Sequence, residues 1–573
     1  MLSEKSLNSY WNFATDAGER GLGLGWNRTV PECVQEILVP SCWNEWKEEM
    51  REYDGVAWYF REFHILKDPN IHRHTLLFYG VNYRCEVWVN GISAGGHVGG
   101  FAPFEIDISR LVKFDTANLV VIRVDSRLNA SSVPPIGVDW YNYGGVYRDV
   151  ILGGYGTGFF EDITVRTKMS GEIGIALETG GYDSMAENTV DICVCESRSG
   201  ISVFEKSFQL NSKSDGLSFR LNNPKLWSLE KPQLYDFTLT LMTNGKESDI
   251  WRHKIGVREI SVKDRRIFIN NEPVILRGYS KHEEYPMYAR SFVKEIVQKD
   301  YDLMRQGGCN FVRMVHYPHH PMEYDIASET GFAVIAETPN VNFTAAFFAD
   351  GEVRKNSLNQ LYELIRHYKN HACILFWSLF IECAADSDEA VKFISECINT
   401  VKTVDPSRLT IHASNRPRED RCLGFFDVMG INYWNGWYNG ETLDEGSALL
   451  DELASLFPEK PIIITSGGWE GMPGLHAYRG ELKWSEESQA NYLDGLTRMY
   501  QSKDYIAGQI SWTFNDFRVM PWIDPGKKWP CGWWTQRPAE MNFKGVLDYY
   551  RRPKLAYYRM QEAFNRWKDV FKK

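Results

Sequence analysis

Residues 310–339 read NFVRMVHYPHHPMEYDIASETGFAVIAETP, two apolar runs with a helix-forming stretch between them. The runs at 310–316 and 332–339 are short and rich in Val, Ile and Phe, which is typical of buried strands. A strand, a helix and a second strand in this order form the unit from which parallel sheets are built. The stretch therefore predicts an α/β domain in this part of the chain.

The same alternation continues from Gly256 towards the C-terminus. Eight runs qualify as strands: VILRGYS (274–280), NFVRMVH (310–316), FAVIAETP (332–339), CILFWSLFIE (373–382), LTIHAS (409–414), DVMGINYW (427–434), PIIITS (461–466) and IAGQISWTF (506–514). Eight β/α units in about 300 residues predict a TIM barrel over 256–573. Active sites of such barrels lie at the C-terminal ends of the strands, so polar residues there are the first candidates.

The first 255 residues have a different texture, in which short β-like runs alternate with turn residues. Runs such as TLLFYGVNYRCEVWVNG (75–91) predict an all-β domain over 1–155. Period-2 alternation in NTVDICVCES (188–197) and YDFTLTLMTNG (235–245) predicts one small β-sandwich over 156–255. The glycine-rich LGGYGTG (152–158) marks the boundary between the two.

Composition excludes several classes of protein. The net charge is −11 with no long basic run, so a nucleic-acid-binding surface has no support. The chain lacks a signal-like N-terminus and an uninterrupted run of 18 apolar residues, so we expect a cytoplasmic protein without a membrane span. Its 20 Trp, 29 Tyr and 31 Phe residues suit β-sandwich cores and carbohydrate-binding clefts.

Metal binding is not expected from the Cys and His pattern. The 11 cysteines form no CxxC pair, which favours reduced thiols over a disulfide framework or a zinc site. His316 and His320 have the spacing of two ligands on one helical face, but Pro318 between them argues against a helix there.

Ordered motifs along nearly the whole chain resemble glycoside hydrolase family 2, and within it the β-glucuronidases. They are VPSCWNEW (39–46), YDGVAWYFREF (53–63), VNYRCEVWVNG (81–91), GVREISVKDRRIFINNEPVILRGYSKHEEYP (256–286), NFVRMVHYPH (310–319), YKNHACILFWS (368–378) and GINYWNGWY (430–438). The resemblance implies an N-terminal jelly-roll β-sandwich, an immunoglobulin-like β-sandwich and a C-terminal TIM barrel. It also implies a retaining hydrolase of β-D-glucuronides that needs no cofactor and no metal.

Glycoside cleavage with retention needs a general acid and a second carboxylate that attacks the anomeric carbon. Glu382, which closes FWSLFIE, stands where the family keeps its acid/base residue. Ser466, at the end of PIIITS, stands where the family has the nucleophilic glutamate. Ile381 replaces the asparagine that in the family bonds the sugar 2-hydroxyl. Both departures predict impaired hydrolysis. Ser466 cannot supply the negative charge that the transition state needs, and Ile381 cannot form the bond to the 2-hydroxyl that strengthens in that state.

Three explanations of Ser466 stay open. The nucleophile could have been replaced deliberately, to trap substrate or to make a glycosynthase. The chain could be a natural pseudoenzyme that binds uronides without cutting them. Glu470 or Glu337 could have taken over the role, although strand-end geometry points position 466 at the anomeric centre.

Sugar specificity depends on Asn542-Phe-Lys544, which matches the Asn-x-Lys motif that holds the uronate carboxylate in the glucuronidases. A C6 carboxylate favours a cation together with a hydrogen-bond donor. Arg537, five residues upstream, matches the family's assisting arginine less closely, because that arginine stands one residue nearer.

The resemblance assigns further substrate contacts across the chain. They are Asp139, His316, Asn432, Trp434, Tyr438 and Trp512, with Trp434 standing where a tyrosine is usual. The expected partner is a small glucuronide or an oligosaccharide that contains uronic acid. A β-galacturonidase is the rival enzyme, and a homo-oligomer stays open.

Overall fold

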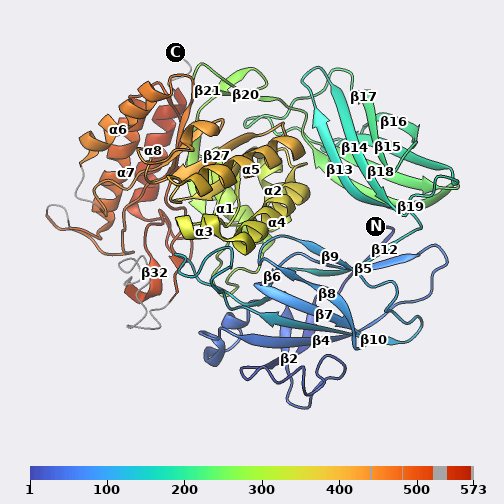
Figure 1. The fold of residues 1–573 in the computed structure, drawn as a ribbon. Coiled ribbons are helices and arrows are strands. Elements are labelled where there is room, and N and C mark those ends of the chain that lie inside the picture. Colours follow the sequence, from blue (N-terminus) through green and yellow to red (C-terminus); the bar gives the residue numbers. More distant parts are fainter. Residues whose placement is uncertain (439–441, 480–481, 521–537, 570–573) are drawn as a thin grey trace.

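The protein folds into three parts, as Figure 1 shows for a computed structural model of the chain. The structure describes residues 1–438, 442–479, 482–520 and 538–569. The N-terminal domain and the second domain pack beside the C-terminal barrel (Figure 1). Within the described ranges, no helix is both long and apolar enough to span a membrane.

The N-terminal domain is a sandwich of two antiparallel sheets. The smaller sheet has the order β1 (Ser3–Ser6), β12 (Val150–Tyr155), β5 (Arg73–Phe78) and β9 (Phe104–Asp107). The larger has the order β3 (Gln35–Val39), β2 (Ser9–Thr15), β4 (Val56–His64), β10 (Ala117–Asp125), β7 (Arg84–Val89) and β8 (Ile92–Val98). A short ladder joins β6 (Val81–Asn82) to β11 (Gly145–Val146). Phe78 of the smaller sheet and Trp11 and Tyr59 of the larger share one buried core, which holds the two layers together.

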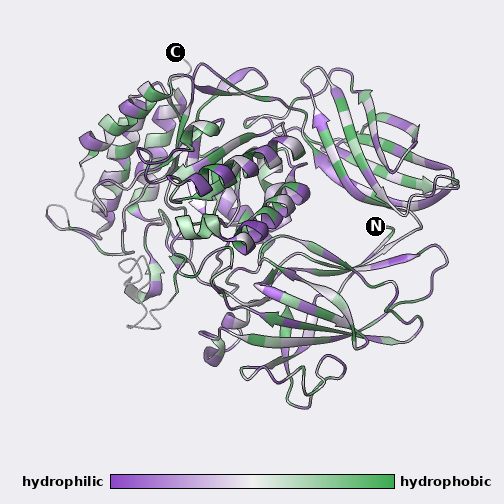
Figure 2. Cartoon of the chain, in the orientation of Figure 1, coloured by the Kyte–Doolittle hydropathy of each residue, from purple (hydrophilic) through white to green (hydrophobic). Residues whose placement is uncertain are grey.

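The second domain is a smaller sandwich with seven strands. Three form the sheet β13 (Phe159–Thr167), β14 (Glu172–Gly180) and β17 (Ser214–Arg220). Four form the sheet β16 (Ser202–Gln209), β15 (Asn188–Glu196), β18 (Tyr235–Thr243) and β19 (Lys246–Ile255). In Figure 2 these strands carry alternating hydrophobic and hydrophilic bands, the pattern expected when one face packs on a core.

The C-terminal part is a closed barrel of eight parallel strands. They are β23 (Leu276–Lys281), β24 (Phe311–Met314), β25 (Ala333–Glu337), β26 (Ile374–Ile381), β27 (Leu409–Ser414), β28 (Met429–Asn432), β29 (Ile462–Ser466) and β30 (Ile506–Ser511). Pairing of β23 with β30 closes the ring. Each of the eight predicted runs contains most or all of one barrel strand, so the expected fold class is confirmed.

Helices surround the barrel, and small antiparallel ladders flank it. The helices are α1 (Lys294–Gln306), α2 (Pro321–Thr330), α3 (Ala345–Ala349), α4 (Gly351–Tyr368), α5 (Asp388–Val404), α6 (Leu443–Leu456), α7 (Glu486–Gln501) and α8 (Leu555–Asp569). The ladders are β20 (Ile260–Lys263), β21 (Arg266–Ile269) and β22 (Glu272–Val274), and β31 (Phe517–Arg518) with β32 (Met541–Asn542). Local sequence explains several helix starts: the Asp350 side chain caps α4, and Thr442 and Glu445 form a capping box at α6.

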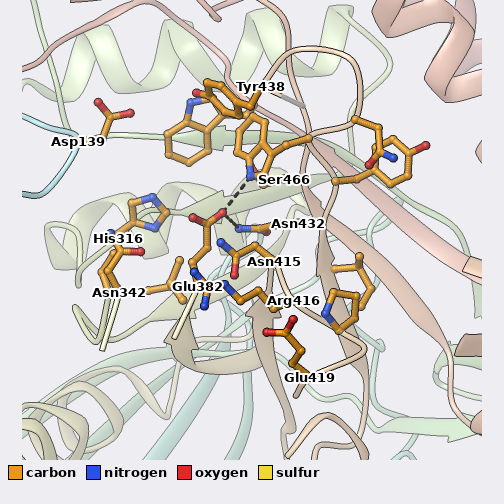
Figure 3. Close-up of a pocket in the computed structure, with 18 of the residues that line it drawn as sticks. Asp139, His316, Asn342, Glu382, Asn415, Arg416, Glu419, Asn432, Tyr438 and Ser466 are labelled. Atoms are coloured by element: carbon orange, nitrogen blue, oxygen red, sulfur yellow. Dashed lines mark hydrogen bonds between the residues drawn. The ribbon is translucent and has the colours of Figure 1, made fainter. Parts of the chain in front are cut away.

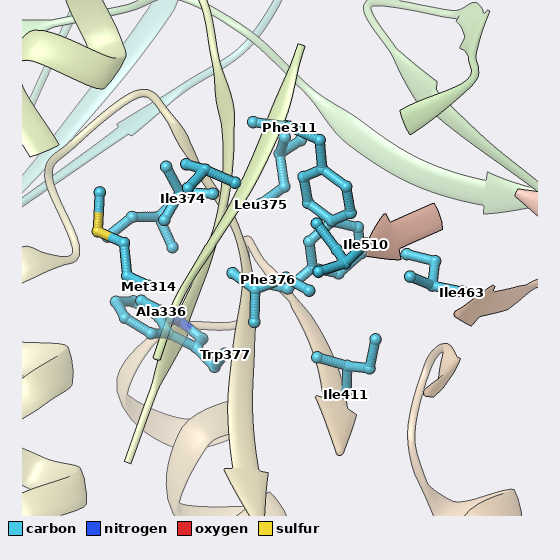
Figure 4. Close-up of a cluster of buried hydrophobic side chains, with 14 of the residues drawn as sticks. Phe311, Met314, Ala336, Ile374, Leu375, Phe376, Trp377, Ile411, Ile463 and Ile510 are labelled. Atoms are coloured by element: carbon cyan, nitrogen blue, oxygen red, sulfur yellow. The ribbon is translucent and has the colours of Figure 1, made fainter. Parts of the chain in front are cut away.

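The barrel strands are buried on both faces, which explains their continuous apolar runs. Figure 4 shows part of this core, where Phe311, Phe376 and Ile510 from three different strands pack together with their neighbours. A core of this kind fixes the strands, and with them the side chains at the strand ends. We retain 1–155, 156–255 and 256–573 as proposed domain boundaries.

Candidate active site

A cavity of about 400 Å³ lies at the C-terminal ends of the barrel strands (Figure 3). Nine of the residues predicted from the sequence line it: Asp139, His316, Ile381, Glu382, Asn432, Trp434, Tyr438, Ser466 and Trp512. Asp139 comes from the N-terminal domain, and the other eight come from the barrel. The fold thus brings together residues that lie more than 370 positions apart in the chain.

Glu382 follows β26 directly and is held firmly in the cavity. Its backbone has a φ of 52°, a left-handed conformation that costs a non-glycine residue about 1 kcal/mol. Its Oε1 accepts hydrogen bonds from Asn432 Nδ2 at 2.7 Å and from Trp434 Nε1 at 2.9 Å (Figure 3). The two donors orient the carboxylate, so a proton on Glu382 has a fixed position relative to a bound sugar.

Trp434 has a role that the sequence did not reveal. The sequence predicted Trp434 only as a substrate contact that replaces the usual tyrosine. The indole N–H instead donates to Glu382. The signal that could have revealed this contact is the position of Trp434, two residues after the end of β28, on the same rim as Glu382.

Ser466 is the last residue of β29 and is 1% exposed. Its Oγ has no hydrogen-bond partner among the described residues. Neighbouring groups are engaged elsewhere, since Thr465 Oγ1 donates to Asn432 Oδ1 at 2.8 Å. No described base therefore activates the Ser466 hydroxyl as a nucleophile.

The two carboxylates considered as substitutes for the nucleophile are both engaged. Oε2 of Glu337 accepts from Arg313 Nη2 at 2.6 Å and from Ser378 Oγ at 2.7 Å, and its Oε1 lies 2.7 Å from His316 Nδ1. Burial alone would raise the pKa of Glu337, but the Arg313 guanidinium and His316 hold that pKa below its ordinary value. Both oxygens are used, and Glu337 is fully buried and outside the cavity lining.

Glu470 is held in the same way, next to the segment 542–544. Its Oε1 lies 2.7 Å from Lys544 Nζ, and its Oε2 accepts from the Phe543 N–H at 2.8 Å. Glu470 does not line the cavity either. These bonds give it a positioning role for the segment 542–544 and oppose a role in attack.

Lys544 and Asn542 lie directly behind the cavity wall. Lys544 Nζ donates to Tyr438 Oη at 2.9 Å, and Asn542 Nδ2 lies 3.4 Å from Asp139 Oδ2. Both residues are fully buried, and neither lines the cavity in this structure. Arg537 lies outside the described residues.

His316 forms part of an aromatic wall. Its ring stacks on Trp512 with centroids 5.1 Å apart, and Trp140 lies at 5.3 Å. Burial lowers the pKa of His316, although its contact with Glu337 opposes this. The lowered pKa favours the neutral imidazole at neutral pH. Ile381 is 2% exposed and belongs to the apolar cluster that includes Trp140 and Trp512.

Six lining residues with amide or charged side chains were not predicted from the sequence. Asn342 follows β25, Asn435 follows β28, and four follow β27: Asn415, Arg416, Arg418 and Glu419. Strand-end position was an available signal, but of these residues only Asn435 lies in a motif, GINYWNGWY.

Models of three domains of one family match the chain in order. They are the sugar binding domain of glycosyl hydrolases family 2 over residues 4–154, the family 2 domain over 159–258, and the family 2 TIM barrel domain over 260–522. Their order and extent agree with the two sandwiches and the barrel.

Two known proteins resemble the chain in sequence along most of its length. A β-glucuronidase of Paenibacillus borealis is 27% identical over 595 residues, which cover 96% of this chain and 95% of that protein. A putative β-glucuronidase of Formosa agariphila is 29% identical over 88% of this chain and 63% of that protein.

A solved structure extends the likeness to three dimensions. The β-glucuronidase of Ruminococcus gnavus in complex with D-glucuronic acid has a TM-score of 0.87 and 27% identity, over 99% of this chain and 97% of that one. The architecture, the family models and these relatives agree, and the chain belongs to glycoside hydrolase family 2.

Proposed function

We propose that this protein is a β-glucuronidase-type glycosidase in which Ser466 occupies the position of the nucleophile and impairs hydrolysis. One observation carries the proposal: Glu382 is oriented by two donors in the same cavity as a buried serine whose hydroxyl has no described partner. The proposed acid/base residue of a retaining glycosidase is thus present, and the position of its nucleophile carries no negative charge.

Glu382 can perform its part of the reaction. A carboxylic acid held by Asn432 and Trp434 can protonate the departing glycosidic oxygen. The same step also needs a second carboxylate that attacks the anomeric carbon as the glycosidic bond breaks, forming the glycosyl-enzyme that water then hydrolyses. Ser466 offers no carboxylate, and Glu337 and Glu470 are held by Arg313 and Lys544.

The choice of a uronide rests on Lys544 with its neighbours. Asn542 and Lys544 contact Asp139 and Tyr438, which line the cavity, so a sugar carboxylate at this end could recruit the buried ammonium. The glucuronidase relatives support a glucuronide over a galacturonide. A non-catalytic uronide-binding protein is the second candidate, favoured by the apolar Ile381 and by Ser466.

Restoring the carboxylate tests the proposal directly. The Ser466→Glu variant should hydrolyse p-nitrophenyl β-D-glucuronide at least about 1,000-fold faster than the original chain, equivalent to ~4 kcal/mol of barrier. A Ser466→Gln variant is the control of similar size without charge, and it should stay inactive. Turnover by the original chain within a few fold of Ser466→Glu would contradict the assignment. If Ser466→Glu also stays inactive while glucuronides still bind, the binding-protein candidate replaces it.

A further inference from the structure

We propose that the cavity includes a leaving-group subsite for a sugar that carries a carboxylate or a sulfate, and that Arg416 binds this anion. The inference rests on the proposed function, because it assumes that a glucuronide occupies the other end of the cavity. It adds a substrate class: acidic oligosaccharides with a β-glucuronosyl end.

The arrangement of the cavity gives it two distinct ends. In Figure 3, Asp139 and Tyr438 lie on one side of the Glu382 carboxylate, and Arg416 and Glu419 lie on the other. The uronate belongs at the first end, next to Asn542 and Lys544. Glu382 protonates the oxygen that joins the two sugars, so the leaving group extends from Glu382 towards Arg416.

Three other charged residues of the loop that carries Arg416 contact the barrel domain: Arg418, Asp420 and Arg421. Arg418 Nη2 lies 2.7 Å from Glu452 Oε2, and Arg421 Nη1 lies 2.8 Å from Asp388 Oδ1. Asp420 lies 2.9 Å from the buried His412 at the base of the loop. These contacts place the loop without involving Arg416.

Arg416 differs from the other two arginines of the loop. Its side chain is exposed at the cavity and forms no ion pair or hydrogen bond within the ranges that the structure describes. Arg418 also lines the cavity, but its guanidinium is paired with Glu452, and Arg421 is paired with Asp388. A guanidinium without a protein partner beside an acid/base glutamate is suited to bidentate binding of a carboxylate or a sulfate.

Neighbouring groups suit the hydroxyls of a sugar. The Asn415 Oδ1 atom is buried and has no described hydrogen-bond partner, and it lies between Glu382 and Arg416 in Figure 3. Glu419 adds a carboxylate acceptor, and Asn342 adds an amide. A buried acceptor without a donor is costly, and a ligand hydroxyl would supply the missing bond. Donors and acceptors mixed in this way favour a saccharide over an aryl leaving group.

Calorimetric titration of the full chain with three disaccharides tests the subsite. Each has a β-glucuronosyl unit with the same linkage to glucose, to glucuronic acid or to glucose 6-sulfate. We expect at least one acidic disaccharide to bind about 10-fold more tightly than the neutral one at low salt, with the advantage falling as salt is added. The stronger of the two acidic ligands identifies the anion.

Two matched variants assign the effect. Arg416→Gln should remove the preference for the acidic ligand and leave the affinity for methyl β-D-glucuronide unchanged, which also shows that the fold is intact. Arg418→Gln should keep the preference, because that guanidinium is bound to Glu452.

Each contrary result has a distinct meaning. Equal affinities for the three disaccharides overturn the subsite and leave the proposed function standing. A preference that survives Arg416→Gln overturns the assignment of the anion to Arg416. Failure of every glucuronide to bind, methyl β-D-glucuronide included, overturns the subsite together with the proposed function.

Discussion

At the scale of single residues, the chemistry depends on the contrast between Glu382 and Ser466. The first has two donors on its carboxylate, and the second has a buried hydroxyl without a described partner. A serine is also smaller than a glutamate, so under the proposed roles the site keeps a base in Glu382 and gains room on the opposite face of the sugar. We therefore expect this combination to favour synthesis over hydrolysis.

Coupling is therefore the first residue-scale prediction. With α-D-glucuronyl fluoride and an alcohol acceptor, we expect the chain to form a β-glucuronide, because fluoride leaves from the side of Ser466 while Glu382 deprotonates the acceptor. Product analysis by mass spectrometry measures the yield. Glu382→Gln should abolish coupling. Coupling that persists in that variant would contradict the role of Glu382 as base.

A second residue-scale prediction concerns Lys544. Lys544→Ala should weaken binding of phenyl β-D-glucuronide by about 10-fold or more and change binding of phenyl β-D-glucoside much less, because only the uronide has a charge to lose. Calorimetry measures both affinities. Loss of Lys544 also leaves Glu470 without its ammonium partner, so thermal unfolding should accompany the titration. Equal losses for the two sugars would show that Lys544 is structural.

Sequence motifs were sufficient to place Glu382 and Ser466, because each lies at the C-terminal end of a strand that is recognisable by its continuous apolar run. They were not sufficient for the contacts of Trp434 with Glu382 or of Lys544 with Glu470. Those bonds join residues 52 and 74 positions apart in the sequence. Only the closed barrel brings these pairs together, and no local pattern encodes a side-chain contact of that range.

At the scale of elements, strands were predictable and loops were not. The barrel strands are buried on both faces, so each leaves a continuous apolar run in the sequence. The loop after β27 leaves no such signal, because its position depends on pairs such as Arg418 with Glu452 and Asp420 with His412. The proposed acid/base residue was therefore found, and the neighbouring Arg416 was missed.

The segment that follows β23 makes a prediction about pH. Glu284 is 4% exposed, and burial raises its pKa from 4.5 to about 7, although Tyr143 Oη donates to it at 2.7 Å. The folded state thus keeps this proton to higher pH than the unfolded state does. Stability should fall as pH rises from 4.5 to about 7, by about 3 kcal/mol at most from this group.

Urea unfolding at a series of pH values between 4.5 and 8 measures this effect. Glu284→Gln keeps an acceptor for Tyr143 and cannot ionise, so its stability should change less over this range than that of the original chain. Glu172→Gln, at an exposed carboxylate, is the control and should leave the pH dependence unchanged. Parallel pH profiles for Glu284→Gln and the original chain would contradict the raised pKa.

At the scale of the whole molecule, the N-terminal domain is part of the site. It contributes Asp139 and Trp140 to the cavity, and it is joined to the barrel by a buried ion pair between Arg148 and Glu283 at 2.7 Å. The sequence predicted the fold classes from strand and helix patterns, but it could not predict this junction. The buried interface is formed by side chains from two domains. The sequence pattern of one domain does not indicate which side chains of the other domain it will contact.

Breaking the Arg148–Glu283 pair tests the coupling between the domains. Both side chains are fully buried, and Arg148 Nη2 also donates to the Pro318 carbonyl at 2.8 Å. Glu283→Gln leaves the guanidinium buried without its counter-charge, so we expect a loss of about 3–5 kcal/mol in the free energy of unfolding. Lys168–Glu172 is the matched exposed pair, with both side chains 58% exposed, and Glu172→Gln should cost less than about 1 kcal/mol.

The Glu283→Gln variant also tests whether the ion pair positions Asp139. Because Arg148 follows the loop that carries Asp139, the affinity of Glu283→Gln for methyl β-D-glucuronide should also fall in conditions where the variant is folded. Unchanged affinity in that folded variant would mean that the barrel positions Asp139 without help from this ion pair.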